Sequence, residues 1–429
     1  MTKKYSELAL FGGKKTINYK FEKYNSIGDE ELIAAQKVIK SGVLSRYLGA
    51  WDKDFYGGEK VQEFESMAAS FFKVKHAITV NSWTSGLICA IGAIGIEPGD
   101  EVIVTPWTMS ATATAILHWN AIPVFADIDF ETYNLLPSSI EANITEYTRA
   151  IVVADIFGQS AEMDEIMEIA KRNNLKVISD TAQSPGATYN NKFAGTIADI
   201  GGYSLNYHKI IHTGEGGILV TNCDELAERM RLIRNHAEVV VKDKKVKDIS
   251  NMIGHNFRLG EIECAIGIEQ LKKLPTLNKK KQFIAEKLTK GLSGLTGLTL
   301  PKIAKKCNHV YYAYPMQVNP SLIGVEREKI WKALAEEGLS LSPYYQNIHL
   351  LPIYQKKIAY GTKGFPWNSD ICKREVSYKK GICPNAESLH DNYYLGFGLA
   401  AYELNENDIA KICETFHKVW RNLDCLCNS

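Results

Sequence analysis

Three segments of the chain carry polar or ionisable residues directly after an apolar run, where a strand would deliver them to a ligand. The first, residues 81–87 (NSWTSGL), places Thr84 and Ser85 at the start of an expected helix. Hydroxyl and backbone N–H groups at a helix N-terminus form a natural phosphate site. The same residue types also cap helices, and taken alone this segment indicates a cap more strongly than a phosphate site.

The second segment, residues 177–183 (VISDTAQ), is an apolar run that ends on Asp180. Ligands of open α/β sheets bind outside the carboxyl ends of the strands, so a ligand could reach this carboxylate. Asp180 could then keep a pyridine nitrogen protonated, or it could simply cap the next helix. The segment alone does not decide between the two.

The third segment, residues 204–209 (SLNYHK), leads into the glycine-rich residues 213–217 (TGEGG). A lysine in such a turn, here Lys209, could act as an amine nucleophile. The chain holds 50 lysines and arginines, so an ordinary surface lysine is the alternative.

The elements that must position these segments are visible as an alternation of short apolar runs and helical patterns. Runs rich in valine and isoleucine are typical of strands buried on both faces of a sheet. The alternation predicts an α/β domain with a mainly parallel seven-stranded sheet flanked by helices. The expected strands are residues 76–80, 101–106, 123–127, 150–155, 176–180, 201–205 and 217–221, and the clearest helices are 85–94, 111–119 and 162–173.

The pattern changes after about residue 250, and this predicts a smaller α+β domain. We expect a large α/β domain over residues 1–255 and the smaller domain over residues 256–429. The expected elements there are helices 261–274, 278–292, 327–338 and 406–423 and a strand at 310–318. Residues 354–383 have weak periodicity, which indicates a long loop or insertion that is either functional or a solvated linker.

Composition excludes several classes of protein. Fifty basic against 49 acidic residues give no long-range attraction to nucleic acid or an anionic membrane. The longest nearly apolar stretch, residues 86–96, is too short to cross a bilayer, and residues 1–13 contain no apolar leader. We therefore expect a cytoplasmic protein.

Common site motifs are also missing from the sequence. It has no Gly-x-Gly-x-x-Gly after its first strand, no Walker A sequence and no His-Glu-x-x-His. The nine cysteines form no Cys-x-x-Cys pair, so neither a disulfide framework nor a zinc site is expected. His208 and His212 are four residues apart, but the glycines that follow are poor helix formers, and we expect no metal.

The order and separations of the three segments together resemble the DegT/DnrJ/EryC1/StrS family. These are pyridoxal-phosphate (PLP) enzymes, sugar aminotransferases of the aspartate-aminotransferase fold, known as fold type I. The resemblance runs through most of the chain. Further matching stretches are residues 64–65 with 71–76, 98–104, 157–159, 256–258 with 270–271, and 384–387.

The resemblance implies catalytic roles for two of the matched residues. Lys209 would bind PLP covalently as an internal aldimine and then shuttle a proton as general base and acid. Asp180 would pair with the pyridinium nitrogen, and Gln183 would lie near the ring oxygen.

The resemblance also implies a phosphate site shared between two subunits. Thr84, Ser85 and Ser204 would hold the phosphate of their own subunit. Asn256 would reach the phosphate of the neighbouring subunit, which implies a homodimer with shared active sites.

Two departures from the family pattern lie close to the expected site. Trp83 stands where the family usually has glycine; its indole could narrow the entry, contact the sugar or pack into the core. The family aromatic that covers the PLP ring is missing from residues 108–112 (TMSAT). Met109, through a sulfur–aromatic contact, and Trp107 are the candidates to replace it.

The resemblance implies a transaminase that uses L-glutamate or L-glutamine and a keto-sugar, usually nucleotide-linked, in amino-sugar or surface-glycan biosynthesis. A cyclitol or other non-nucleotide acceptor is the alternative, as is a PLP/PMP-dependent sugar dehydratase. The dehydratases carry histidine in place of the lysine, so Lys209 favours transamination, with His208 as the alternative in a register shifted by one. A non-catalytic regulator of the same fold is a third alternative. Tyr345 and His349, together with Trp83, are further candidate pocket residues.

Overall fold

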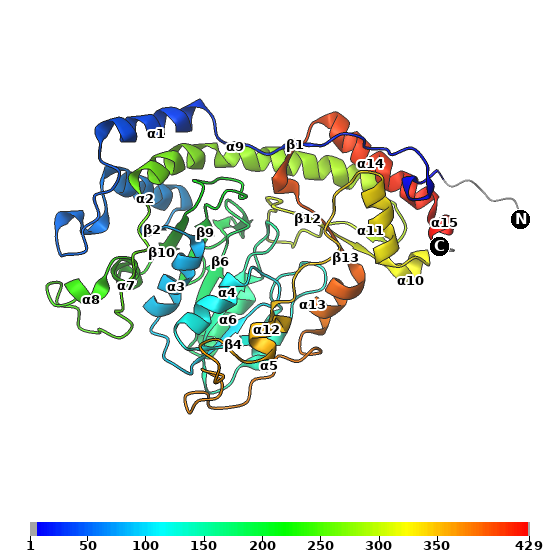
Figure 1. Ribbon diagram of the computed structural model, residues 1–429. Helices are drawn as coiled ribbons and strands as arrows, with labels where there is room; N and C mark the ends of the chain where they lie inside the picture. The colour runs from blue at the N-terminus through cyan, green and yellow to red at the C-terminus, as the bar shows by residue number, and fades with distance from the viewer. Residues whose placement is uncertain (1–6, 428–429) are drawn as a thin grey trace, which may run out of the picture.

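A seven-stranded sheet forms the centre of the computed structural model, which describes residues 7–427 (Figure 1). The first six residues, part of the stretch in which we expected no apolar leader, lie outside this range. The strands, in order across the sheet, are β2 (His76–Val80), β10 (Gly217–Thr221), β9 (Ile200–Ser204), β6 (Lys176–Asp180), β5 (Thr148–Ala154), β3 (Glu101–Val104) and β4 (Ile122–Phe125). All seven predicted strands are therefore present.

The sheet is mainly parallel, as predicted. Only β10 runs antiparallel to its neighbours β2 and β9, while the remaining neighbours pair in parallel. It follows that β2, β9 and β6 end at the same edge, which brings the three chemistry-bearing segments together. The predicted α/β fold class is confirmed.

Helices cover both faces of the sheet. Side chains alternate along a strand: on β10, Leu219 packs in the cluster that includes α3 (Trp83–Ala93), whereas Ile218 and Val220 pack with α2 (Glu59–Phe72). The other helices near the sheet are α4 (Ala111–His118), α5 (Pro137–Asn143), α6 (Met163–Arg172), α7 (Asp224–Arg234) and α8 (Ala237–Val240).

One long helix, α9 (Glu261–Leu292), replaces the two helices predicted on either side of Pro275 (Figure 1). The prediction of a break was wrong. Proline removes one backbone hydrogen bond, but its exposed ring faces away from α1 (Asp29–Ser41), α2 and α14 (Glu406–Arg421), which pack along the helix. Tertiary packing therefore holds the two halves in one helix.

The C-terminal part has its own three-stranded antiparallel sheet of β11 (Leu298–Thr299), β12 (Tyr314–Val318) and β13 (Tyr394–Phe397). Its separate hydrophobic cluster includes the second half of α9, α11 (Arg327–Glu336) and α14. The strand predicted from residue 310 begins only at Tyr314, because Val310 N–H and Ala313 N–H bond to carbonyls of Gly158 and Phe157 instead. The domain boundary at residue 255 stays a prediction.

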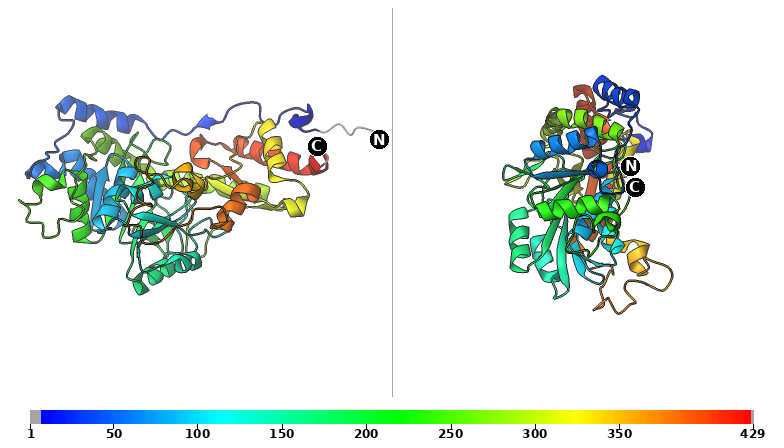
Figure 2. Two further views of the ribbon diagram at one scale, coloured as in Figure 1. Left: turned by 60° about the horizontal axis from the view of Figure 1, so that its bottom comes forward. Right: turned by 90° about the vertical axis from the view of Figure 1, so that its left-hand side faces the viewer.

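The remaining short elements connect these parts. The N-terminal segment runs alongside α9 to the C-terminal part, where β1 pairs with β14 (Figures 1 and 2). These elements are η1 (Ala9–Phe11), β1 (Glu22–Lys23), η2 (Lys53–Tyr56), β7 (Thr188–Tyr189), β8 (Lys192–Phe193), α10 (Pro320–Ile323), η3 (Ile348–Leu350), α12 (Pro352–Gln355), α13 (Pro384–Ser388), η4 (Leu389–Tyr393), η5 (Leu399–Ala401), β14 (Tyr402–Glu403) and α15 (Leu423–Cys427). Within residues 7–427, no helix is both long enough and apolar enough to cross a membrane. The cytoplasmic location stays a prediction.

The predicted insertion is a docked loop. Residues 356–383, all of which the structure describes, form no helix or strand. Trp367 and Tyr378 are nonetheless buried, and the Tyr378 hydroxyl donates to the Pro123 carbonyl at 2.8 Å. The interpretation of this segment as a solvated linker is therefore wrong, because its aromatic side chains pack against the large sheet.

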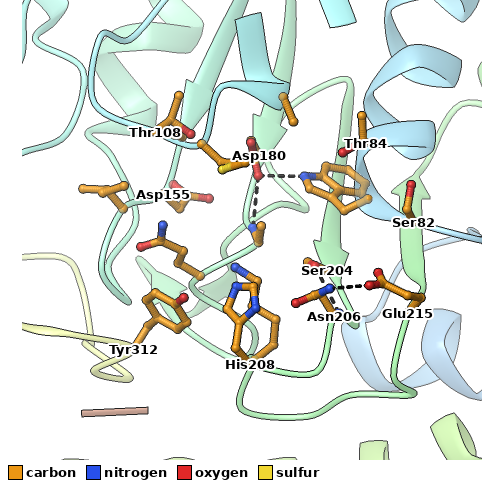
Figure 3. Close-up of a pocket in the computed structure, with 18 of the residues that line it drawn as sticks. Ser82, Thr84, Thr108, Asp155, Asp180, Ser204, Asn206, His208, Glu215 and Tyr312 are labelled. Carbon is orange, nitrogen blue, oxygen red and sulfur yellow. Dashed lines mark hydrogen bonds between the residues drawn. The ribbon is translucent and has the colours of Figure 1, made fainter. Parts of the chain in front are cut away.

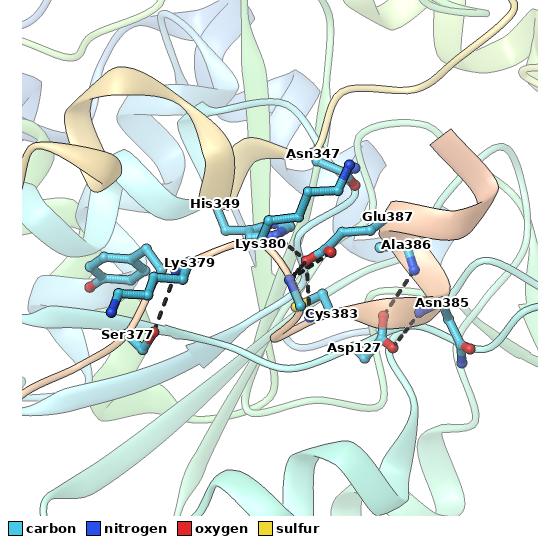
Figure 4. Close-up of polar contacts among 12 residues, drawn as sticks. Asp127, Asn347, His349, Ser377, Lys379, Lys380, Cys383, Asn385, Ala386 and Glu387 are labelled. Atoms are coloured by element: carbon cyan, nitrogen blue, oxygen red, sulfur yellow. Dashed lines mark hydrogen bonds and ion pairs between the residues drawn. The ribbon is translucent and has the colours of Figure 1, made fainter. Parts of the chain in front are cut away.

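A buried polar cluster fastens the end of this loop (Figure 4). The Glu387 carboxylate accepts hydrogen bonds from Gly381 N–H and Cys383 N–H and lies 2.9 Å from Nε2 of His349. Asp127, at the end of β4, accepts from two N–H groups of the first turn of α13, those of Asn385 and Ala386. His349, a candidate pocket residue in the sequence, is thus fully buried in this cluster.

Candidate active site

A cavity of about 260 Å³ lies at the sheet edge where β2, β6 and β9 end (Figure 3). All three predicted segments contribute to its wall, together with two tyrosines from the C-terminal part. The lining residues with polar or aromatic groups are Ser82, Trp83, Thr84, Thr108, Asp155, Asp180, Gln183, Ser204, Asn206, His208, Lys209, Glu215, Tyr312 and Tyr345.

Lys209 reaches the cavity from the turn that follows β9. Its backbone N–H donates to the Asn206 carbonyl at 2.9 Å, and its side chain is 8% exposed. Nζ lies 4.7 Å from the centre of the Tyr312 ring. Burial lowers the pKa of the Lys209 amine to about 8, although the negative charge of Asp180 opposes this shift. Near pH 8 a substantial fraction of Lys209 is therefore the neutral amine, the form that acts as a nucleophile.

The neighbouring His208 also lines the cavity but is exposed. Partial burial and the charge of Lys209 lower its pKa to about 4, so the ring is neutral at pH 7.

Asp180 is held by three donors. Trp83 Nε1–H donates to Oδ1 at 2.7 Å, and Ala182 N–H donates to the same oxygen at 3.2 Å. The Thr112 hydroxyl donates to Oδ2 at 2.6 Å, and Thr112 is in turn 2.8 Å from the Thr108 hydroxyl. A carboxylate offers about four acceptor positions. One position therefore remains for a donor in the cavity.

The N-terminus of α3 supplies hydroxyl groups at another wall. Ser82 is the N-cap, and its Oγ accepts from Ser85 N–H at 3.1 Å. The Ser85 hydroxyl donates to Asn81 at 2.7 Å, so it belongs to the capping network and does not line the cavity. Ser82, Thr84 and Ser204 do line it. The phosphate roles of Thr84, Ser85 and Ser204 stay predictions.

Gln183 bridges the large domain and Tyr345. Its Nε2 donates to the Tyr345 hydroxyl at 3.1 Å, and its Oε1 accepts from Phe157 N–H at 2.9 Å. Beside it, burial raises the pKa of Asp155 to about 6, although hydrogen bonds from Thr181 and Ala161 oppose the rise. Asp155 therefore titrates between pH 5 and 7 in the cavity wall.

The two candidates for covering the ring lie in different places. Met109 lines the cavity and is 66% exposed. Trp107 is fully buried outside the cavity wall, where its indole N–H donates to Asn347 at 2.7 Å and its ring lies parallel to Tyr133. Met109 is thus available to a ligand, whereas Trp107 belongs to the core in this structure. Both ring-covering roles stay predictions.

Asn256 lies outside the cavity wall and is exposed. Its Oδ1 accepts from Nε of Arg258 at 2.7 Å, and its carbonyl is 3.3 Å from the amide of Asn81, next to α3. The exposed side chain can therefore face a second subunit, and its role at the partner's phosphate stays a prediction.

Several lining residues did not stand out in the sequence. Asp155 had a signal, because it ends a predicted strand at the same edge of the sheet. Ser82 had a weaker one as an N-cap. Nothing in the sequence indicated Tyr312 as a lining residue, because it lies within the predicted strand at residues 310–318. Thr112 contacts Asp180 without lining the cavity. The sequence placed it in the segment 108–112 near the site but did not indicate this contact.

Comparison with known proteins identifies the family. Residues 44–384 match the sequence pattern of the DegT/DnrJ/EryC1/StrS aminotransferase family. The chain belongs to this family. It is therefore an enzyme, a PLP-dependent aminotransferase, as the sequence resemblance implied.

Individual relatives cover most of this aminotransferase. The spore coat polysaccharide biosynthesis protein SpsC of Bacillus subtilis is 34% identical over 82% of this chain and 89% of its own. GDP-perosamine synthase of Caulobacter vibrioides is 36% identical over 69% of this chain and 79% of its own. Among solved structures, S. venezuelae DesV in complex with a ketimine intermediate aligns with a TM-score of 0.76 and 27% identity, over 91% of this chain and 94% of DesV.

Proposed function

We propose that this aminotransferase moves an amino group from L-glutamate or L-glutamine to a nucleotide-linked keto-sugar in amino-sugar or surface-glycan biosynthesis. The observation that carries the proposal is the buried Lys209 amine, with its lowered pKa, in one cavity with the triply hydrogen-bonded Asp180. The names of two relatives support the acceptor class. One is a GDP-perosamine synthase, and the other is a spore coat polysaccharide biosynthesis protein.

The cavity fits PLP in its donor set. Lys209 would bind the aldehyde carbon covalently, the open acceptor position of Asp180 would take the ring N–H, and Gln183 would lie near the ring oxygen. Thr84 and Ser204, which line the cavity, would hold the phosphate. In the described part of the chain, Oδ1 of Asn206 is buried without a hydrogen-bond partner, as expected of a wall that a polar ligand completes.

Bound PLP supplies an electron sink that stabilises negative charge on the substrate carbon next to the amine. The protein supplies position and proton transfer. Three donors hold the Asp180 carboxylate in one orientation, and its negative charge would keep the proton on the ring nitrogen. Nζ of Lys209, once displaced by the incoming amine, moves the proton as general base and then as general acid.

We also propose a homodimer in which each subunit completes the other's phosphate site. The exposed position of Asn256 beside α3 supports this arrangement, because a residue there can contact a partner without moving the cavity wall.

The acceptor class can be tested with the purified chain and PLP. Incubation with L-glutamate and a nucleotide-linked 4-keto sugar should give 2-oxoglutarate and an amino sugar in equal amounts, measured by mass spectrometry. Amination of a keto-cyclitol but not of the nucleotide sugar would support the alternative acceptor. Loss of water from the sugar without a new amine would support the dehydratase and contradict the proposal.

A further inference from the structure

The indole of Trp83 stands at a position where the sequence resemblance led us to expect glycine. Trp83 is the first residue of α3, and it is 6% exposed although it lines the cavity. Its Nε1–H donates to Oδ1 of Asp180 at 2.7 Å. The side chain that could have narrowed the entry instead reaches inward to the carboxylate.

Glycines from two other places make room for this indole. A Cβ on Gly202 of β9 would lie 2.2 Å from Cζ3 of Trp83, and one on Gly86 would lie 2.7 Å from Cε3. Distances under about 3 Å are closer than van der Waals contact allows. The ring is therefore fixed in its orientation by the backbone of β9 and the next turn of α3.

The indole forms one half of a frame around Asp180. Trp83 holds Oδ1 from the first turn of α3, and Thr112 holds Oδ2 from the first turn of α4. Helices α3 and α4 pack against each other. The carboxylate thus has a fixed direction before any ligand is present.

The N–H group also acts on the charge of Asp180. A hydrogen bond to a carboxylate offsets part of its negative charge. Asp180 is the group that raises the pKa of Lys209 against the effect of burial. The other titratable groups in the cavity wall are Asp155, His208, Glu215, Tyr312 and Tyr345. None of them donates to Asp180 in the described part of the chain. Removal of the indole N–H should therefore change the effect of Asp180 on the pKa of Lys209 directly.

We propose that Trp83 is a positioning residue, whose indole N–H fixes the Asp180 carboxylate toward the ring nitrogen of the cofactor. The inference rests on the proposed pairing of Asp180 with that nitrogen.

The test compares Trp83→Phe with the full-length wild type, because phenylalanine keeps an aromatic ring and loses the donor. Trp119→Phe is the matched control, since Trp119 is also buried and its N–H donates to the Ile88 carbonyl away from the cavity. The readout is the pH dependence of the rate at which the cofactor-free protein captures PLP, followed by absorbance. The dissociation constant of PLP and kcat with L-glutamate are measured alongside.

In Trp83→Phe we expect the pH midpoint of the PLP capture rate to rise by about half a pH unit or more. The full negative charge of Asp180 then raises the pKa of Lys209. The PLP dissociation constant should rise and kcat should fall about tenfold, as for loss of a hydrogen bond to a charged group. Trp119→Phe should match the wild type in all three. Equal values for Trp83→Phe and wild type would overturn the inference.

Two further outcomes are distinguished, a variant that does not fold and a wild type that does not capture PLP. If Trp83→Phe does not fold, Gly86→Ala takes its place. The three atoms nearest the added methyl belong to the side chains of Trp83 and Val80, so we expect it to push the indole from Asp180. The same shift is then expected, and its absence counts against the inference. If the wild type itself captures no PLP, the proposed function fails and this inference falls with it.

Discussion

Burial gives Lys209 the neutral amine that a nucleophile needs, and it also makes this residue unfavourable for folding. The pKa of Lys209 is lowered from 10.5 to about 8, so the folded chain releases this proton more easily than the unfolded chain does. The destabilisation is therefore fully present below about pH 8 and disappears as the pH rises to 10.5.

Replacing the amine should thus stabilise the cofactor-free protein. We expect Lys209→Met to raise the free energy of unfolding at pH 7 by about 1–3 kcal/mol, because a buried charge is removed. The gain should shrink between pH 8 and 10.5, as measured by urea denaturation at several pH values. Lys279→Met, at an exposed position of α9, should show no such trend. A gain that is independent of pH would mean that the buried charge is not its cause.

At the residue scale, the sequence predicted the positions of Asp180 and Lys209 from strand ends and that of Thr84 from an expected helix N-terminus. For Gln183 and Ser204 the sequence offered only the family resemblance; all five line the cavity. It could not predict the direction of the Trp83 indole. That direction depends on Gly86 and on Gly202, which is more than a hundred residues away. Ser85 was also expected at the site, but it does not line the cavity because its hydroxyl donates to Asn81.

At the scale of elements, helix α9 shows tertiary packing overriding a local signal. Proline inside a helix removes one hydrogen bond and is unfavourable, and this local rule predicted two helices. Both halves of α9 contribute to hydrophobic clusters, the first half with α2 and the second with the C-terminal sheet. No periodicity within residues 261–292 carries that information.

We expect Pro275→Ala to raise the free energy of unfolding by about 1–3 kcal/mol, because alanine restores a backbone donor within the helix. Thr276→Ala, at the adjacent exposed position, should change it by less than about 1 kcal/mol. Both are measured by chemical denaturation. A destabilised Pro275→Ala would mean that the proline ring makes a needed contact.

A second element-scale prediction concerns the loop of residues 356–383 and the buried polar cluster that holds its end. Glu387→Ala leaves Gly381 N–H, Cys383 N–H and His349 without their acceptor. We expect a loss of about 1–3 kcal/mol, as for buried hydrogen-bonding groups left without a partner, and faster proteolysis within the loop. Lys380→Ala removes the exposed pair with Asp391, which solvent screens, and should leave the stability and the rate of proteolysis close to those of the wild type. Equal effects of the two variants would contradict the assigned role of the cluster.

At the scale of the whole molecule, the cavity needs both parts of the chain. The sheet edge supplies Lys209 and Asp180, while Tyr312 and Tyr345 come from beyond the predicted boundary at residue 255. The alternating pattern of the first half was strong enough to predict the α/β class. It could not predict how the C-terminal part closes the cavity, because that depends on contacts between distant segments.

The proposed shared sites predict complementation between two inactive variants. Lys209→Met and Asn256→Asp should each have little activity alone, the second because its charge repels the partner's phosphate. In a mixed dimer, one site combines the intact Lys209 of one subunit with the intact Asn256 of the other. Refolding an equal mixture should therefore recover about a quarter of the wild-type activity. No recovery, with dimers verified by sedimentation, would contradict a shared site.

The most direct test of the central claim is the absorption spectrum of the purified protein with PLP, before and after excess L-glutamate, with Lys209→Met alongside. We expect the wild type to show the visible band of covalently bound PLP, and L-glutamate to convert it to the near-ultraviolet band of the amine form. Lys209→Met should never show the visible band of a protein-bound cofactor. If the wild type forms no such band, or if Lys209→Met forms it equally well, the assignment of Lys209 as the cofactor-binding residue is wrong.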